Sequence, residues 1–163
     1  SISDIKKGLL NFKGVERRFN KIFNYKGANI YDDYAHHPTE IIEVLDGVSK
    51  GYKEKKIVCI FQPHRISRLN YLKKEFCLSF KKASTVILCP IYKAGENLKS
   101  NLNYYRFAEQ IAKKSNVDVF LVNNQHELAN FLKRSLDSEN IVIGMGAGSI
   151  SNWIKELPLL LKE

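Results

Sequence analysis

The chain has 163 residues, 44% hydrophobic and 26% charged, which are ordinary values for a globular protein with a buried core. No apolar run approaches the roughly 20 residues that cross a bilayer, and the start of the chain lacks a signal peptide's apolar block, so we expect a cytoplasmic protein with no membrane partner. The net charge of +9 is carried by lysines scattered over predicted helices. That pattern favours a small anionic ligand and predicts no nucleic-acid partner.

The first 27 residues differ in pattern from the rest of the chain. Residues 3–10 predict a short helix. Residues 17–25 predict a strand in which Phe19 and Phe23 share one face at period two. A Lys-Gly turn joins this strand to the next, at 28–31, so the two must pair antiparallel at one edge of a sheet.

From residue 28 onward, near-continuous apolar runs alternate with segments of helical period. Such runs predict strands buried on both faces, as in parallel sheets. We therefore expect an α/β fold over one domain, residues 1–163: Rossmann-like, doubly wound, with a mostly parallel six-stranded sheet, one antiparallel edge strand and helices on both faces. The expected later strands are 28–31, 56–61, 85–89, 117–122 and 140–144, and the expected helices are 39–48, 69–80, 104–112, 127–136 and 150–161.

Three cysteines, Cys59, Cys77 and Cys89, lie far apart in apolar runs. An odd number with this spacing predicts buried, reduced thiols and neither a disulfide framework nor a zinc site. Nucleophilic catalysis is not indicated either, because no base is adjacent to them and no serine sits in a nucleophile elbow.

The stretch Asp-Asp-Tyr-Ala-His-His-Pro-Thr-Glu at 32–40 lies between a predicted strand and a predicted helix. Pro38 suits the first turn of a helix and Glu40 favours its dipole, so helix initiation explains this half of the stretch. It does not explain the two aspartates or the two histidines. A carboxylate at the carboxyl end of a strand commonly accepts from ribose hydroxyl groups. Two adjacent imidazoles without a spaced third ligand disfavour zinc.

The sequence Phe-Gln-Pro-His-Arg-Ile-Ser-Arg at 61–68 leaves the strand at 56–61, so it falls on the same carboxyl edge of the sheet. One helical turn would bring Arg65 and Arg68 to one face, where paired guanidinium groups can bind a carboxylate or phosphate by forked hydrogen bonds. The alternative is a solvated surface pair, and the pattern supports the two interpretations about equally.

Gly-Met-Gly-Ala-Gly-Ser-Ile at 144–150 also follows a strand and opens a helix. Its glycine spacing fits neither a dinucleotide fingerprint nor a phosphate loop. A tight strand-to-helix turn is the simpler interpretation, and the helix N-terminus could still face an anion.

These motifs, taken in chain order, resemble the C-terminal domain of the Mur ligases of bacterial peptidoglycan synthesis. The resemblance runs nearly end to end, and the block at 61–68 favours the members that join L-alanine to UDP-N-acetylmuramate over the related muropeptide-recycling ligases. It rests on Gly-Val-Glu-Arg-Arg-Phe at 14–19, the stretches at 32–40 and 61–68, Tyr-Lys-Ala-Gly-Glu at 92–96 and Gly-Ala-Gly-Ser-Ile at 146–150.

The resemblance implies an ATP-dependent ligase. In such enzymes ATP phosphorylates the muramoyl carboxylate, and the amine of L-alanine attacks the acyl phosphate to give an amide, ADP and phosphate. The family has a UDP-binding domain, a central ATPase domain with the phosphate loop and the Mg2+ ligands, and a C-terminal domain, and only the last resembles this chain. The implied partners are ATP, L-alanine, UDP-N-acetylmuramate and the rest of the ligase chain, and we expect this chain to be inactive alone.

Matched by motif, four residues are implied to contact ATP. Asp33 would accept from the ribose, Arg18 would reach the phosphates once the domain closes, and Tyr34 and His36 would lie beside the nucleotide. Three more residues, His64, Arg65 and Arg68, would bind the L-alanine carboxylate, and the resemblance does not decide which arginine makes the fork. No metal ligand is implied here, because the family keeps Mg2+ on the central domain.

One function of another class also fits the predicted fold, a stand-alone Rossmann-like module that binds a nucleotide or a nucleic acid. Such a module would bind its ligand tightly by itself, with steeply salt-dependent affinity for a nucleic acid. A closing domain would bind ATP weakly until it is joined to its partner domains.

Overall fold

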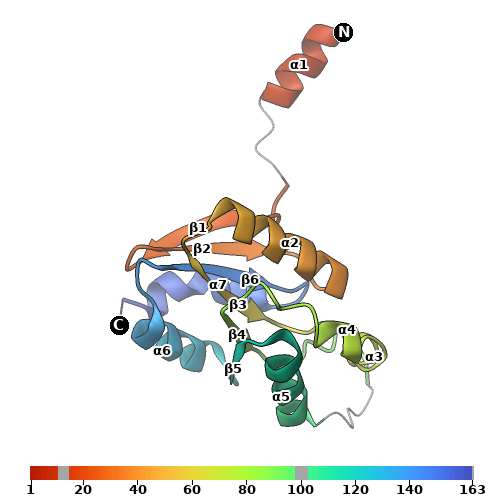
Figure 1. Cartoon of the computed structure of the whole chain (residues 1–163). Helices are drawn as coiled ribbons and strands as arrows, with labels where there is room; N and C mark the ends of the chain where they lie inside the picture. Colours follow the sequence, from red (N-terminus) through yellow and green to blue (C-terminus); the bar gives the residue numbers. More distant parts are fainter. Residues whose placement is uncertain (11–14, 98–102, 163) are drawn as a thin grey trace.

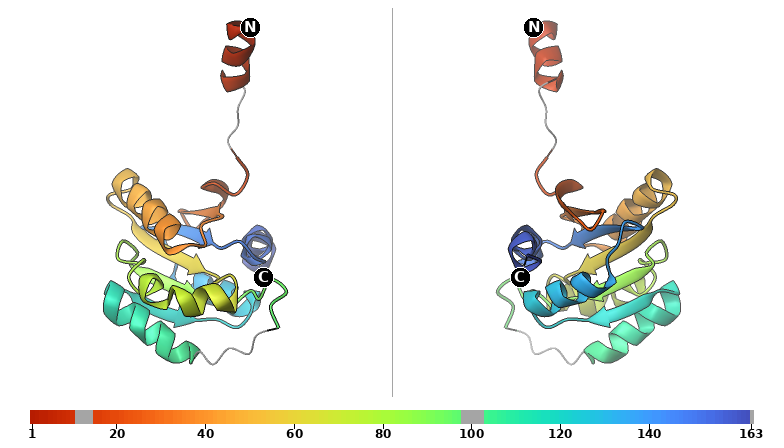
Figure 2. Two further views of the ribbon diagram at one scale, coloured as in Figure 1. Left: turned by 90° about the vertical axis from the view of Figure 1, so that its right-hand side faces the viewer. Right: turned by 90° about the vertical axis from the view of Figure 1, so that its left-hand side faces the viewer.

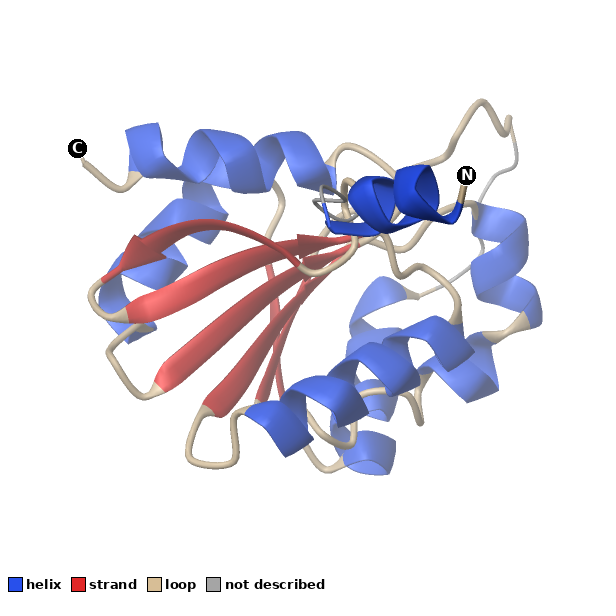
Figure 3. Cartoon of the chain, turned by 90° about the horizontal axis from the view of Figure 1, so that it is seen from above, coloured by secondary structure: helices blue, strands red, loops and turns tan. Residues whose placement is uncertain are grey.

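The computed structural model describes residues 1–10, 15–97 and 103–162. A six-stranded sheet with the order β1-β2-β6-β3-β4-β5 forms its centre (Figures 1 and 3). Every neighbouring pair is parallel except β1 and β2, which confirms the predicted sheet with one antiparallel edge strand. The strands are β1 (Asn20–Tyr25), β2 (Ala28–Asp33), β3 (Lys56–Phe61), β4 (Thr85–Leu88), β5 (Asp118–Leu121) and β6 (Asn140–Met145).

Helices cover both faces of the sheet, as predicted (Figure 2). One face carries α2 (Pro38–Gly51), α3 (Ile66–Tyr71), α4 (Lys73–Phe76) and α5 (Tyr104–Ser115). The other carries α6 (Gln125–Ser135) and α7 (Ile150–Leu160). Along β3, Cys59 and Phe61 point to the first layer and Ile60 to the second. The strand reads as a continuous apolar run because both of its faces are buried.

The first helix, α1 (Ile2–Leu10), lies apart from the sheet in Figures 1 and 2, and its Ile2 and Ile5 are 74% and 64% exposed. None of the helices in the described ranges is long and apolar enough to cross a membrane. All three cysteines are buried and free, as predicted. Burial raises the pKa of Cys59 and of Cys89, which keeps both thiols protonated.

The edge strand β1 differs from its prediction. It begins at Asn20, because Arg17 and Phe19 adopt left-handed conformations with φ of 58° and 51°. Its register with β2 shifts between Lys21 and Phe23, as at a β-bulge. Phe19 therefore packs under α2 while Phe23 packs under α7, so the predicted shared face is wrong.

The prediction of a single helix over 69–80 is also wrong, because the structure has two helices there, α3 and α4. Leu72 ends one and begins the other with a non-helical backbone (φ −103°, ψ 22°). After α4, the Ser115 hydroxyl on α5 accepts from the Phe80 N–H at 3.1 Å and donates to the Cys77 carbonyl at 2.8 Å. A side chain distant in sequence thus satisfies backbone groups that a continuous helix would have paired internally.

Candidate functional site

The predicted site residues gather at the carboxyl edge of the sheet, in the loops that follow β2, β3, β4 and β6. A parallel bridge between His64 and Tyr92 joins the loops after β3 and β4. Arg65 N–H donates to the Tyr92 carbonyl at 2.8 Å, and Tyr92 N–H donates to the Pro63 carbonyl at 2.8 Å. These backbone bonds make the two loops one surface.

An aromatic row crosses this edge. The rings of Tyr34 and His36 lie 5.1 Å apart, those of His36 and His64 5.8 Å, and those of His64 and Tyr92 5.5 Å, the last pair stacked at 21°. The structure thus brings His36, expected to lie beside ATP, next to His64, expected to bind the amino acid. Tyr92 also belongs to this row. The sequence predicted that it lies in a loop on this edge but gave it no role in the site.

The surroundings of His64 favour its neutral form. Burial lowers its pKa, and the neighbouring Arg68, His36 and Arg65 lower it further against an opposing effect of Glu96. Arg68 Nη1 lies 3.3 Å from His64 Nδ1. Because a guanidinium only donates, Nδ1 is the acceptor in this contact and Nε2 carries the proton.

The two arginines of this loop differ in setting. Arg68 lies on α3 and is half-buried, whereas Arg65 precedes the helix with a left-handed backbone (φ 69°) and is exposed. Within the described ranges, the Arg65 guanidinium forms neither a hydrogen bond nor an ion pair. Glu96 lies nearby, but its carboxylate accepts from the Ser67 N–H and hydroxyl group. In the described part of the chain, Glu96 therefore contacts Ser67 and forms no ion pair with Arg65.

Asp33 is the last residue of β2, whereas the strand predicted from the sequence ended at residue 31. It is 3% exposed, and its two oxygens accept from the N–H groups of Phe19 and Ala35, both at 2.8 Å. Burial raises its pKa, and these two bonds and the charge of Arg18 oppose that effect. A ribose hydroxyl would be a further donor to a carboxylate that already holds two backbone groups.

The second histidine of the pair begins α2. His37 Nδ1 accepts from the Thr39 N–H at 3.3 Å, and Glu40 Oε2 accepts from the N–H groups of His36 and His37. This is a capping box in which histidine replaces the usual serine or threonine. Helix initiation, which had explained Pro38 to Glu40, extends to His37 and leaves His36 as the histidine that faces the edge.

Gln62 is a structural residue that the sequence did not single out. It is 3% exposed, its Oε1 accepts from the Ile150 N–H at 3.0 Å, and its Nε2 lies 3.1 Å from Ser149 Oγ. The N-terminus of α7, which could have faced an anion, is capped by this side chain. A lone amide after an otherwise apolar strand was the available signal, because a buried amide needs a partner.

Two glycines make that close approach possible. Gly146 has φ of 152°, and a Cβ there would lie 2.9 Å from the Gln62 carbonyl oxygen. A Cβ at Gly148 would lie 2.6 Å from Gln62 Oε1 and would overlap with the Tyr92 ring. The glycine motif is therefore a tight turn against the neighbouring loops, as the simpler interpretation held.

Arg18 lies at the other end of the row. It is exposed, and its Cζ lies 5.8 Å from the centre of the Tyr34 ring. Gly14, the first residue of its motif, falls outside the described residues. Across the described ranges, no group of three or more His, Cys, Asp or Glu side chains is placed to hold a metal ion.

Residues 17–148 match the protein family described as Mur ligase, glutamate ligase domain. The chain belongs to this family. The resemblance seen in the motifs is thereby confirmed, and a stand-alone binding module is not favoured.

Individual Mur ligases show the same relationship. A UDP-N-acetylmuramate–L-alanine ligase from Pelagibacter ubique (strain HTCC1062) is 60% identical over 157 residues, which are 96% of this chain and 34% of that protein. The crystal structure of UDP-N-acetylmuramate–alanine ligase from Thermotoga maritima aligns with a TM-score of 0.75 at 24% identity, over 99% of this chain and 34% of that one. A murein peptide ligase from Psychrobacter arcticus aligns with a TM-score of 0.74 at 19% identity, over 95% and 32%.

The two solved structures are equally good matches in shape, and because they are only 24% and 19% identical to this chain they show the fold alone. This Mur ligase chain spans about a third (34%) of the length of the curated relative.

Proposed function

We propose that residues 1–163 form the C-terminal domain of an ATP-dependent ligase that joins L-alanine to UDP-N-acetylmuramate in peptidoglycan synthesis. The observation that carries the proposal is the continuous edge on which Arg18, Tyr34, His36, His64 and Arg68 lie, in a chain that is 60% identical to a ligase of that name. The domain would bind the amino acid and close over ATP held by another domain.

The β2 side of the edge fits the nucleotide. Arg18 is exposed, and a guanidinium forms forked hydrogen bonds with phosphate oxygens. The rings of Tyr34 and His36 offer flat faces beside it, and Asp33, the residue before Tyr34, would accept from a ribose hydroxyl. Mg2+, which would neutralise phosphate charge during transfer, would be held by the central domain.

The β3 side fits a small carboxylate. Arg65 and Arg68 supply two guanidinium groups, and the neutral His64 adds an Nε2 donor without a further charge to balance. Fixing the carboxylate of L-alanine here would orient its amine toward the acyl phosphate. The amine nitrogen then forms a bond to the carbonyl carbon, the bond from that carbon to the bridging oxygen breaks, and the amine gives up a proton. Phosphate leaves with this oxygen, which came from the muramoyl carboxylate.

The division of labour between domains gives the direct test. The 163-residue chain has no phosphate loop, so with ATP, L-alanine and UDP-N-acetylmuramate it should release no phosphate above background. The complete ligase should do so under the same conditions. Phosphate release by this chain alone that depends on all three substrates would overturn the proposal. Micromolar binding of ATP by the isolated chain would favour a self-sufficient nucleotide module instead.

A further inference from the structure

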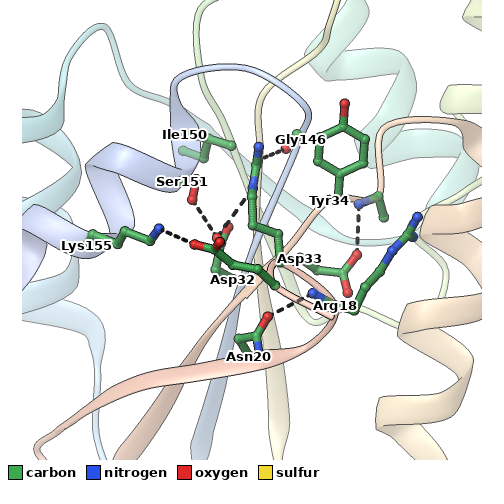
Figure 4. A network of polar contacts seen from close by, with 12 residues as sticks. Arg18, Asn20, Asp32, Asp33, Tyr34, Gly146, Ile150, Ser151 and Lys155 are labelled. Carbon is green, nitrogen blue, oxygen red and sulfur yellow. Dashed lines mark hydrogen bonds and ion pairs between the residues drawn. The ribbon is translucent and has the colours of Figure 1, made fainter. Parts of the chain in front are cut away.

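Arg17 and Asp32 stand beside the residues proposed to contact ATP but have no role in that site. They form a buried ion pair, with Arg17 Nε 3.5 Å from Asp32 Oδ2 and side chains 21% and 1% exposed. Arg17 Nη2 also donates to the Gly146 carbonyl. The Ser151 hydroxyl on α7 donates to Asp32 Oδ2 at 2.5 Å (Figure 4). We call this group of four residues the clasp.

The backbone of Arg17 is held as firmly as its side chain. Its carbonyl accepts from the Tyr34 N–H at 2.7 Å, and its guanidinium carbon lies 4.8 Å from the centre of the Tyr34 ring. Arg17 therefore contacts the end of β2, the turn after β6 and the loop before α2. Its guanidinium group already contacts Asp32 and the Gly146 carbonyl.

A second anchor follows Arg18. The Phe19 N–H donates to Asp33 Oδ2 at 2.8 Å, and the Phe19 ring stacks on Tyr31 with centres 4.1 Å apart and planes 5° from parallel. Arg18 thus lies between two anchors, one held by Asp32 and the other by Asp33.

Both anchors have a backbone conformation that is unfavourable for them. Arg17 and Phe19 have φ of 58° and 51°, where residues with a Cβ are uncommon. Such conformations persist when the surrounding contacts determine them, and they concentrate at functional sites. Between them, Arg18 is exposed, and its side chain forms no hydrogen bond or ion pair with another residue in the described ranges.

We propose that Arg17 is a positioning residue, and that the clasp, together with the Phe19–Asp33 contact, presents Arg18 to the carboxyl edge as a ready site for the phosphates of ATP. The inference rests on the proposed function, which supplies the ligand of Arg18. A backbone that is already held in place on both sides of Arg18 loses less conformational freedom when the ligand arrives. Because Asp32 neutralises Arg17, Arg18 is the arginine of this pair whose charge stays free for the ligand.

A double-mutant cycle in the complete ligase tests this. Arg18→Ala should lower kcat/KM for ATP about 100-fold, since it removes a charged contact to phosphate. Arg17→Ala should lower the same parameter about tenfold and leave KM for L-alanine unchanged, because it only loosens Arg18. In an Arg18→Ala background, Arg17→Ala should then have an effect of less than about twofold.

Three further variants make the result specific. Arg17→Lys keeps the charge but lacks the planar fork, so it should resemble Arg17→Ala. Asp32→Asn keeps the shape of the clasp and removes its ion pair, so it should lower kcat/KM for ATP less than Arg17→Ala does. It replaces the Arg17 variants as the test if those fold poorly. Lys155→Ala, the control, breaks an exposed ion pair with Glu16 (3.1 Å) next to the clasp and should change nothing.

The outcomes separate this inference from the proposed function. Unchanged ATP kinetics in Arg18→Ala would show that Arg18 does not bind ATP. The proposed positioning role of the clasp would then be wrong as well. A full effect of Arg17→Ala in the Arg18→Ala background would show that Arg17 acts by itself and would overturn the inference alone. Thermal unfolding of each variant completes the test, because a uniform loss of kcat with a lowered Tm would indicate a structural role only.

Discussion

The β2 side and the β3 side of the carboxyl edge hold their charged residues by different means. On the β2 side, two carboxylates face inward and are used by Arg17 and by backbone N–H groups, which leaves one exposed cation, Arg18. On the β3 side no carboxylate is buried among the residues that the structure describes. A buried amide, Gln62, fixes the loop, and two arginines remain near the surface.

In each motif, then, some polar residues hold the loop in place while their neighbours remain accessible to a ligand. Arg17 supports Arg18, His37 begins a helix beside His36, and Gln62 precedes His64. Adjacent and chemically similar residues therefore differ in accessibility, and substitutions on the two sides should have separable effects.

The largest expected effect lies on the β3 side. In the complete ligase, Arg65→Ala and Arg68→Ala should each raise KM for L-alanine much more than KM for ATP, because a carboxylate that loses a guanidinium partner loses on the order of 2–5 kcal/mol. Steady-state kinetics with each substrate varied in turn measures this. Arg134→Ala removes the same charge from α6, on the far side of the sheet, and should alter neither constant. If Arg65→Ala left alanine kinetics unchanged, Arg68 would remain as the candidate for the fork.

A smaller effect is expected where the β3 side meets the glycine turn. Gly148→Ala should destabilise the chain by about 1–3 kcal/mol, because the added methyl group meets the Tyr92 ring and Gln62 Oε1. Gly47→Ala in α2 is the matched control. Its Cβ would meet nothing within 4 Å, so it should stabilise the helix by about 0.5–1 kcal/mol. Urea unfolding of the 163-residue chain measures both effects. Equal unfolding midpoints for the two variants would show that the turn accommodates a methyl group at residue 148, contrary to this prediction.

The smallest effect lies at His64, where the two sides meet. Its pKa is lowered, so the unfolded chain binds a proton more readily than the folded one. The stability associated with the neutral ring is present above its ordinary pKa of about 6.5 and is lost as the pH falls through the lowered value. Arg68→Ala removes one of the charges that lower this pKa, so an NMR titration should show the pKa rising toward its usual range. An unchanged pKa would show that the charge of Arg68 does not contribute to the shift.

The strands and the edge on which their loops meet could be predicted from the sequence, because burial on both faces and the direction of parallel strands are local and topological properties. The roles of Asp32 and Gln62 could not. Asp32 pairs with Ser151, 119 residues later, and Gln62 caps Ile150, 88 residues later. A motif shows that a polar group needs a partner at the end of a strand, but the partner is chosen by the packed fold.

The same limit explains the errors around β1 and α3. Period two predicts a strand, but nothing local to the segment shows a shift of register such as that between Lys21 and Phe23. Helical spacing at 69–80 correctly places Leu72, Phe76 and Phe80 on one stripe, since Phe76 and Phe80 belong to one core and Leu72 packs against it. It gives no sign of the non-helical backbone at Leu72, which divides the segment into α3 and α4.

The buried thiols have a consequence for observing how this domain opens. Cys59 belongs to the layer under α2 and α5, and Cys89 to the layer under α6 and α7. Because both are buried and protonated, a thiol reagent reaches each one only when its own layer separates from the sheet. The alkylation rate at Cys59 therefore measures the opening of one helical layer, and the rate at Cys89 measures the opening of the other. Equal rates would indicate that the two layers separate together, and different rates that they separate in sequence.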